Sequence, residues 1–404
     1  MAFRFLHTAD LHLDSPLRSL ALRDPDLAEM IADASRTTLR RIIELALTEQ
    51  VDALLIAGDL YDGGQTSMKT ARFLAAELGR LDSAGIRVFI IRGNHDAESQ
   101  ITRELTLPPS THVFSGRAGV EMVAEGSQRV AIHGLSFRDR HAPESLLPKY
   151  RPPVADALNI GLMHTSLGGA PGHDPYAPCA LADLQASGFD YWALGHIHKR
   201  AQYPGPVHVV MPGIPQGRHI GEPGTGTVTF GHFDDAGTLR AEERAVAVAE
   251  FARVAVDITD LEDWGALRGA ISEALEGARG TAQHLVARLV LGGNSPLASR
   301  LHRDADIALA EAQDLARGLD NIWVEKLTLE LKARPPAAGA LGELSQIISR
   351  DVLTSPAYAQ ALTEIQESLI RALPAELRDD LAQRDEAAQH AGLTEIMARL
   401  EGSA

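Results

Sequence analysis

The chain has 404 residues, and its 38 lysines and arginines stand against 54 aspartates and glutamates, which gives a formal net charge of −16. This length exceeds what one hydrophobic core usually supports, so we expect two or three domains. The acidic balance argues against a protein that coats nucleic acid through an excess of Lys and Arg. It does not exclude an enzyme that acts on nucleic acid, because bound metal ions can supply local positive charge.

The cysteine content and the hydropathy pattern exclude several other classes. A single cysteine, Cys179, allows neither an internal disulfide nor a thiolate zinc cluster. The N-terminal sequence lacks the charged segment and the long apolar core of a signal peptide. No apolar run approaches the roughly 18 residues that a membrane-spanning helix needs. We therefore expect a cytoplasmic protein that makes no membrane contact.

Up to about residue 235, short apolar runs alternate with helical patterns. Phe3 to Thr8 is a strand candidate, a helix is expected over about Asp26 to Gln50, and Ala53 to Ala57 has the pattern of a buried strand. A second helix near Met68 to Leu81 leads to a buried strand at Val88 to Ile91. Further strands are expected at Val120 to Val123, Val130 to His133, Leu158 to Met163, Tyr191 to Leu194 and Val207 to Val210. This alternation predicts an α/β fold whose sheet is covered on both faces.

From Phe251 the pattern starts again and predicts a compact βαβαβ unit. Its elements are expected at Arg253 to Ile258, Trp264 to Leu275, Leu285 to Leu291, Ala305 to Ala316 and Val324 to Leu331. The segment from Arg334 to Gly339 has the composition of a linker. Beyond it, Leu341 to Leu400 has a wholly helical pattern. We expect three parts, residues 1–240, 245–335 and 340–404.

Five polar clusters each follow directly on a strand candidate in the first 200 residues. They are Asp10 with His12, Asp59, Asn94 with His95, His164, and His196 with His198. Loops at the ends of strands in α/β sheets converge and are held rigidly, so these side chains can meet at one site. Carboxylate, imidazole and amide groups suit Mn²⁺, Fe²⁺ or Zn²⁺, and there are enough of them for two metals that share a carboxylate. Two metals about 3.5–4 Å apart can polarise a phosphoryl group and generate hydroxide near neutral pH, which is the chemistry of phosphate-ester hydrolysis.

In chain order, the motifs Asp-x-His, Gly-Asp-x-x-Asp, Gly-Asn-His-Asp, His and Gly-His-x-His resemble those of the calcineurin-like metallophosphoesterase superfamily. The segment from Ala9 to Pro16 and the later segment from Gln216 to His219 resemble the YhaO branch of the SbcD-type DNA-repair exonucleases. The superfamily motifs span residues 8 to 199, whereas the resemblance of the region after residue 245 rests on layout. The resemblance implies a four-layer αββα sandwich, a smaller α/β capping domain and a helical C-terminal tail.

Carried over residue by residue, the resemblance implies two metal ions bridged by Asp59. The first would be held by Asp10, His12, Asp59 and His198, and the second by Asp59, Asn94, His164 and His196. His95 would lie beside the scissile phosphate, and Asp96 would orient His95. Candidates for contact with substrate phosphate flank the motifs: Lys199, Arg200, Arg218 and His219. For the three cations among them, solvated surface charge is the competing interpretation.

One position departs from part of the superfamily. Some of these nucleases carry a histidine three residues after the bridging aspartate, where this chain has Asp62, as the bacterial SbcD branch does. The departure leaves the metal ligands intact and argues against a second catalytic imidazole. Protein phosphatases of the superfamily have an arginine shortly after this position, and the sequence Asp62-Gly63-Gly64 therefore argues against phosphoprotein substrates.

The expected function is that of a DNA exonuclease with two Mn²⁺ ions that acts in DNA repair. The alternatives are a small-molecule phosphodiesterase or nucleotidase that uses the same site, and a non-catalytic regulatory subunit of an SMC-type ATPase complex. The resemblance implies DNA, a second copy of the chain and an SMC-type coiled-coil ATPase (SbcC-like or YhaN-like) as partners. The ATPase would dock on the C-terminal helices, for which self-packing is the alternative. A plain oligomerisation domain fits the capping region nearly as well.

Overall fold

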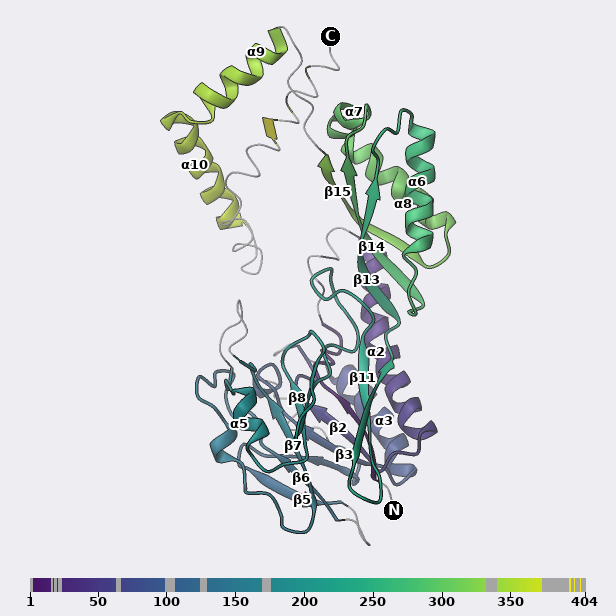
Figure 1. The fold of residues 1–404 in the computed structure, drawn as a ribbon, viewed down its shortest axis with the longest axis vertical. Helices are drawn as coiled ribbons and strands as arrows, with labels where there is room; N and C mark the ends of the chain where they lie inside the picture. The colour runs from purple at the N-terminus through teal and green to yellow at the C-terminus, as the bar shows by residue number, and fades with distance from the viewer. Residues whose placement is uncertain are drawn as a thin grey trace. The chain divides into compact units, whose positions relative to one another are not determined.

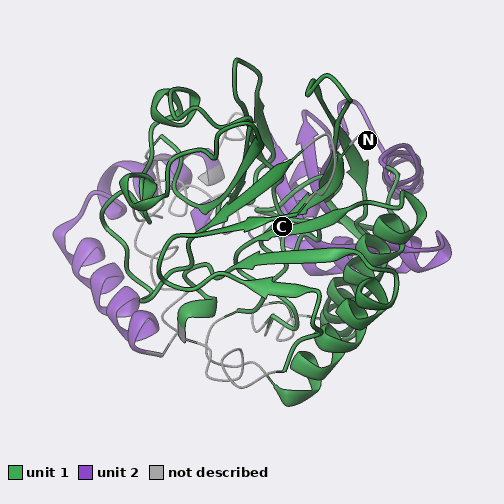
Figure 2. Cartoon of the chain, turned by 90° about the horizontal axis from the view of Figure 1, so that it is seen from below, with its two compact units in different colours: residues 1–252, 279–286 green, residues 253–278, 287–404 purple. Residues whose placement is uncertain are grey.

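A computed structural model describes residues 3–15, 17, 20, 24–62, 67–98, 106–123, 129–168, 176–331 and 340–372, with isolated positions after residue 391. The chain divides into two compact units (Figure 2). Unit 1 comprises residues 1–252 and 279–286, and unit 2 comprises residues 253–278 and 287–404. All residues of the five polar clusters belong to unit 1.

Unit 1 contains a first six-stranded sheet with the order β12-β11-β1-β2-β3-β4. The strands β1 to β4 run parallel, whereas β11 is antiparallel to β1 and to β12. The bounds are β1 Phe3–Thr8, β2 Ala53–Ala57, β3 Arg87–Ile91, β4 Thr111–Val113, β11 Thr227–Phe233 and β12 Leu239–Ala245. The helices α2 (Pro25–Thr48) and α3 (Met68–Ser83) connect the first three strands. The side chain of Asp24 accepts a hydrogen bond from the amide of Leu27 and so caps α2, and Ser67 caps α3 in the same way.

A second six-stranded sheet in unit 1 has the order β5-β6-β7-β8-β10-β9. Its four central strands β6, β7, β8 and β10 run parallel. The bounds are β5 Gly119–Met122, β6 Val130–Gly134, β7 Leu158–His164, β8 Tyr191–Gly195, β9 Ala201–Tyr203 and β10 His208–Met211. The short α-helix α5 (Leu181–Gln185) and the 3-10 helices η2 (Asp96–Glu98) and η3 (Leu147–Lys149) lie in the connections.

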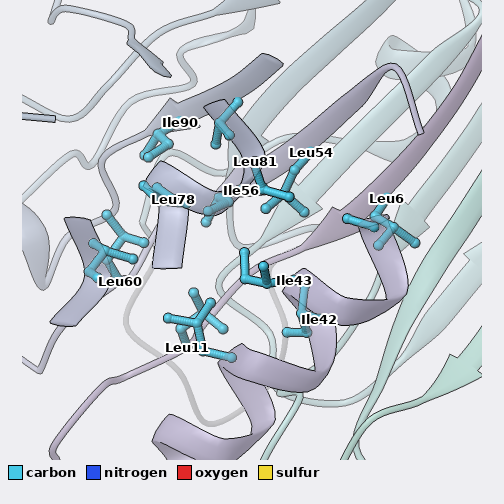
Figure 3. Close-up of a cluster of buried hydrophobic side chains, with 14 of the residues drawn as sticks. Leu6, Leu11, Ile42, Ile43, Leu54, Ile56, Leu60, Leu78, Leu81 and Ile90 are labelled. Carbon is cyan, nitrogen blue, oxygen red and sulfur yellow. The ribbon is translucent and has the colours of Figure 1, made fainter. Parts of the chain in front are cut away.

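The alternation of side chains along the strands explains how the layers pack. Leu6 and Ile56 belong to a buried cluster with Ile42 and Ile43 of α2 and with leucines of α3 (Figure 3). Their neighbours point the other way, and residues such as Leu55 form a second cluster with side chains of β6, β7 and β8. A third cluster covers the outer face of the second sheet with side chains from α5 and the adjoining loops. The two sheets therefore form a sandwich between outer layers, which confirms the predicted α/β sandwich.

Most of a three-stranded sheet with the order β13-β14-β15 belongs to unit 2, and the helices α6, α7 and α8 lie between these strands in the chain (Figure 1). The elements are β13 Ala249–Asp257, α6 Trp264–Gly277, β14 His284–Gly293, α7 Ala298–Arg303, α8 Ala305–Gly318 and β15 Ile322–Leu331. The predicted strands and helices of this βαβαβ unit are present, and α7 is an additional helix. Buried residues along one side of each helix, such as Leu267 and Ile271 of α6 and Ala312 of α8, pack the unit.

The C-terminal part of the described chain is helical, as predicted. It contains α9 (Ala340–Ile347), a π-helical segment η4 (Ile348–Val352) and α10 (Pro356–Ala372). The linker expected at Arg334 to Gly339 and most of the helical pattern expected after Ala372 lie outside the described residues. Among the helices that the structure describes, none combines the length and the apolar character that crossing a membrane requires.

Candidate metal centre

The polar clusters of unit 1 lie where parallel strands end. Asp10 and Asp59 are each the second residue after their strands, β1 and β2, and His164 is the last residue of β7. The backbone of Asp10, Asp59 and His196 has φ values of 53°, 53° and 101°, in the left-handed region that residues with a side chain rarely adopt. Such conformations gather at functional sites, because the surrounding fold must hold them in place.

Asp10, His12 and His198 form a first group of potential ligands. Asp10 and His12 are buried, and one ligand atom from each of the three residues lies within 4.8 Å of the others. The Nε2 atoms of His12 and His198 are 3.2 Å apart. The amide of His196 donates to both carboxylate oxygens of Asp10, at 3.1 and 3.0 Å, and so fixes this side chain between the two sheets.

Asp59 and His164 form a second group, again with Asp10. The Nδ1–H of His164 donates to the carbonyl of Ala57 at 2.9 Å, so Nε2 is the atom that faces the group. That Nε2 lies 3.3 Å from Oδ2 of Asp59 and 2.9 Å from Oδ1 of Asn94. The same Oδ2 of Asp59 lies 3.9 Å from Nε2 of His12, so this carboxylate faces both groups. Asp59 can therefore bridge two metal ions, one held by each group.

His196 is the remaining ligand that the sequence suggests. Its ring lies beside that of His164, with 5.1 Å between the ring centroids, and beside that of Tyr176, at 5.2 Å. Tyr176 carries no sequence signal that would mark it as part of the site. Its amide donates to Oγ of Ser166 just beyond β7, which places the ring against the cluster.

The electrostatics of the cluster reflect the burial of opposite charges. Burial disfavours the charge of Asp59, yet the charge of His164 and the hydrogen bond with it hold the pKa of Asp59 well below its usual range. Burial raises the pKa of Asp10. For His164, burial disfavours the charged ring, but the charge of Asp59 and the hydrogen bond with it outweigh this and raise the pKa to about 9. Perturbations of this kind, in groups that converge at strand ends, are typical of functional sites.

The donor set fits divalent metals. Carboxylate oxygens, imidazole nitrogens and an amide oxygen converge in a buried place, and a cation there would compensate the two neighbouring carboxylates Asp10 and Asp59. The one cysteine, Cys179, packs in the cluster on the outer face of the second sheet, away from these ligands. Hard and borderline metals such as Mn²⁺, Fe²⁺ or Zn²⁺ match these ligand atoms.

His95 lies at the edge of the cluster, and the carboxylate that binds it is Asp62. Nδ1 of His95 is 3.0 Å from Oδ1 of Asp62, and its ring centroid lies 5.1 Å from that of His12. Burial disfavours a charged His95, but the hydrogen bond with Asp62 and the charges of Asp59 and Asp62 together raise its pKa. The amide of His95 also donates to Oδ1 of Asp59 at 3.0 Å.

The expected role of Asp96 is corrected by these contacts. Its buried carboxylate accepts hydrogen bonds from the backbone amides of Leu60, Tyr61 and Gly93, at 3.2, 3.1 and 3.1 Å. Asp96 therefore ties the loop after β2 to the loop after β3, and Asp62 is the partner of the His95 ring. Asp96 follows His95 directly in the chain, whereas Asp62 belongs to the preceding motif, so the sequence favours Asp96 and only the fold brings Asp62 to the ring.

The candidates for contact with substrate phosphate are either paired with groups of the chain or exposed. Arg218 donates to Glu222, and its Nη1 lies 3.6 Å from Oδ2 of Asp62. Arg200 donates to Thr229 and pairs with Glu243 on the hairpin of β11 and β12. Lys199 and His219 are exposed, and Nε2 of His219 lies 3.5 Å from Oε1 of Glu222. The guanidinium groups of Arg218 and Arg200 are thus already paired with carboxylates of the chain itself.

Comparisons with known proteins identify the family of the chain. The family model described as calcineurin-like phosphoesterase matches residues 3–200, and that described as the middle domain of metallophosphoesterase YhaO matches residues 251–332. The uncharacterized metallophosphoesterase YhaO of Bacillus subtilis (strain 168) is 35% identical over 298 residues, which are 72% of each chain.

Two kinds of named nuclease or repair protein are more distant relatives. The DNA double-strand break repair protein Mre11 of Methanocaldococcus jannaschii is 27% identical over 202 residues, 48% of this chain and 51% of that one. The SbcD component of the nuclease SbcCD of Rhodobacter capsulatus is 34% identical over 170 residues, 39% of this chain and 38% of that one. The chain thus matches about half or less of the length of these two relatives.

Proposed function

The chain belongs to the calcineurin-like metallophosphoesterase family, and we propose that it is a metal-dependent DNA exonuclease that hydrolyses phosphodiester bonds in DNA repair. The observation that carries the hydrolytic part is the convergence of Asp10, Asp59 and His164 with the other buried ligands at the strand ends of two packed sheets. Two metals between such ligands would suit phosphoryl transfer, because they can stabilise both the attacking and the leaving oxygen.

The proposed ligand sets follow the two groups. Asp10, His12, Asp59 and His198 would hold one ion, and Asp59, Asn94, His164 and His196 the other. We propose Mn²⁺, which accepts this mixture of oxygen and nitrogen ligands. Bound there, the two ions would polarise the phosphoryl group and lower the pKa of water near it.

His95 is the proposed proton donor of the site. Asp62 accepts from Nδ1, so the proton that His95 can give is the one on Nε2. The hydrogen bond with Asp62 and the nearby carboxylates favour the protonated ring by raising the pKa of His95, and the ring is 31% exposed, so a substrate can approach it. His95 would thus stabilise charge on the phosphate or protonate the departing sugar oxygen. Asp96 contributes by holding the two motif loops together.

The DNA part of the proposal draws on the relatives and on the C-terminal helices. Mre11 is named a double-strand break repair protein, and SbcCD is named a nuclease. Apolar side chains of the C-terminal helices are exposed, among them Ile347 (48%), Ile365 (58%) and Leu369 (46%). Ile365 and Leu369 are four residues apart on α10 and so share one face of this helix, and exposed apolar residues that gather on one face mark a surface for association. We propose that a coiled-coil ATPase of the SMC type covers them, in the cytoplasm, and that the nuclease unit also pairs with a second copy.

A second candidate is a small-molecule phosphodiesterase or nucleotidase that uses the same metals. It is favoured by the pairing of Arg218 and Arg200 with carboxylates of the chain, which withdraws two cations from the phosphates of a long polymer. The net charge of −16 points in the same direction. A non-catalytic regulatory role in an ATPase complex is the remaining alternative.

The experiment compares DNA with a small phosphodiester. Purified wild type, His95→Ala and the control His112→Ala are incubated with Mn²⁺ and either linear duplex DNA or bis(p-nitrophenyl) phosphate. His112 is a fair control, because it is a similarly exposed histidine (37%) on β4. We expect the wild type and His112→Ala to degrade DNA, and His95→Ala to lose at least 10²-fold in rate, as general acids commonly contribute. Intact DNA with a hydrolysed small ester would establish the second candidate, and inactivity without bound metal would indicate the regulatory role.

A further inference from the structure

Glu222 is a buried carboxylate beside the metal centre that no motif includes. It lies in the loop after β10, and its side chain is only 5% exposed. A buried charge costs free energy unless charged or polar groups compensate it. Here the compensation comes from the guanidinium of Arg218 and the ring of His198, both within hydrogen-bond distance of the carboxylate. The site thus contains one carboxylate more than the proposed ligands need.

The hydrogen bonds of the Glu222 side chain are divided between a metal-ligand candidate and an arginine. Oε1 is 2.7 Å from Nδ1 of His198 and 2.7 Å from Nη2 of Arg218. Oε2 accepts from the amide of Arg218 at 2.8 Å and from its Nε at 3.3 Å. The guanidinium of Arg218 binds both carboxylate oxygens of Glu222, so this side chain has little freedom to turn away from His198.

The contact with Glu222 determines which nitrogen of His198 can bind a metal. A carboxylate only accepts, so Nδ1 of His198 must carry the proton. Nε2 then keeps its lone pair, and this is the atom that lies 3.2 Å from Nε2 of His12 in the first ligand group. Without Glu222, the ring could take the other tautomer or rotate, and either change removes the lone pair from the site.

The loop that carries Glu222 is itself anchored to the fold. Gln216 is buried, and its Oε1 accepts from the amides of Val248 and Ala249 at 2.9 and 3.1 Å. Its Nε2 donates to the carbonyl of Ala249 at 2.8 Å. Six residues later, the amide of Glu222 donates to the carbonyl of His219 at 2.9 Å and closes a turn. Glu222 is therefore presented to His198 by rigid backbone.

We propose that Glu222, clamped by Arg218, is a positioning residue that holds His198 with Nε2 toward the first metal. Arg218 then serves the metal centre through Glu222 rather than by binding substrate phosphate. This inference rests on the proposed metal set, in which His198 is a ligand. Partners of this kind commonly contribute about 10- to 100-fold to metal affinity.

The test measures metal binding on the whole 404-residue chain. MnCl₂ is titrated by calorimetry into chelator-stripped wild type, Glu222→Ala, Glu222→Gln and His198→Ala. Glu250→Gln is the matched control, because Glu250 is also buried in unit 1 but bonds to Thr225 rather than to a proposed ligand. We expect Glu222→Ala to weaken one of two sites about 10- to 100-fold, Glu222→Gln to weaken it less, and Glu250→Gln to leave both unchanged. Thermal unfolding shows which variants are folded.

A tautomer measurement separates positioning from a general structural effect. In ¹⁵N-histidine-labelled protein, the signals absent from His198→Ala identify His198, and the wild type should carry the proton on Nδ1. Glu222→Gln, which keeps the shape of the side chain, should show a mixture of tautomers. Folded Glu222 variants with two sites of wild-type affinity and an unchanged His198 tautomer would overturn the proposal. If His198→Ala also keeps both sites, the ligand set itself is wrong, which is a separate failure of the proposed function.

Discussion

Gly93 offers the sharpest test of where the metal ligands lie, because its missing side chain makes room for two of them. A Cβ atom at this position would lie 2.8 Å from Cγ of Asp59 and 2.8 Å from Cε1 of His164, and closer still to Oδ1 of Asp59. Carbon atoms in contact are normally about 3.5–4.0 Å apart, so Gly93→Ala must displace its neighbours by about 1 Å. Both neighbours are anchored: Asp59 accepts from the amide of His95, and His164 donates to the carbonyl of Ala57.

The expected size of the effect follows from this displacement. Overpacking of a dense interior costs about 1–3 kcal/mol, which the fold should tolerate, whereas a 1 Å misplacement of reacting groups can cost about 10²-fold in rate. Gly79→Ala is the matched control, because Gly79 lies within α3 and a Cβ there meets nothing within 4 Å. That variant should be as active as the wild type and more stable by about 1 kcal/mol, since alanine favours a helix interior.

Three measurements on Gly93→Ala and Gly79→Ala test the placement of Asp59 and His164: thermal unfolding, Mn²⁺ titration and hydrolysis of bis(p-nitrophenyl) phosphate. We expect Gly93→Ala to remain folded, to bind Mn²⁺ more weakly at both sites and to lose about 10²-fold in turnover. Both sites should be affected, because Asp59 faces both ligand groups. A folded Gly93→Ala that keeps wild-type affinity and turnover would refute the placement of Asp59 and His164 at the centre.

Three further outcomes are expected. Asp62→Asn should retain metal and lower turnover about 10- to 100-fold. It should also shift the alkaline limb of the pH–rate profile to lower pH, because the raised pKa of His95 depends on Asp62. An unshifted limb would contradict the pairing of Asp62 with His95. Burial, with the charge of Arg200, lowers the pKa of His7 to about 3. Between this value and the ordinary histidine pKa of 6.5, the ring is therefore neutral in the folded protein and protonated in the unfolded chain. The contribution of His7 to the free energy of unfolding is thus present above pH 6.5 and is lost as the pH falls towards about 3, by about 1.4 kcal/mol per pH unit within that window. In denaturant unfolding, the free energy of unfolding of His7→Gln should therefore fall less steeply with pH than that of the wild type. Chelation of metal should lower the unfolding temperature and abolish hydrolysis, and Mn²⁺ at 100 times its dissociation constant should restore about 2.7 kcal/mol per site.

The sequence predicts the central strands and the residues at their ends, because both signals are local. Runs such as Ala53–Ala57 are continuously apolar, since packed layers cover both faces of the strand, and a polar motif directly after such a run must lie at the sheet edge. The strands at and next to the edge of the first sheet carry weaker signals. The edge strand β12 (Leu239–Ala245) is charged and mostly exposed or partly buried, and its neighbour β11 (Thr227–Phe233) contains a glycine and a histidine, so neither has the apolar run of a buried strand.

The sequence does not predict which residues of different motifs contact one another. Asp96 is the chain neighbour of His95, but the turn of the backbone after β3 directs its carboxylate to the amides of Leu60 and Gly93, and Asp62 of the preceding motif binds the ring instead. Glu222 lies in a loop rich in proline and glycine, with no periodicity to mark it. Its partnership with His198 requires the second sheet to bring β8 beside β10. The pair of Arg218 and Glu222 carries no signal in the sequence either, because a spacing of four residues brings side chains together in a helix, and this segment is a loop.

The distribution of charge around the centre changes what the net charge of −16 means for phosphate binding. Arg218 pairs with Glu222 and lies near Asp62, and Arg200 pairs with Glu243, so neither guanidinium offers a full positive charge to a phosphate. The carboxylates of Asp10 and Asp59 add negative charge at the same place. A phosphodiester would therefore be repelled by the bare centre and attracted to it once divalent cations are bound, since two such ions outweigh two carboxylates. Metal loading should therefore control the binding of a phosphodiester as well as its hydrolysis.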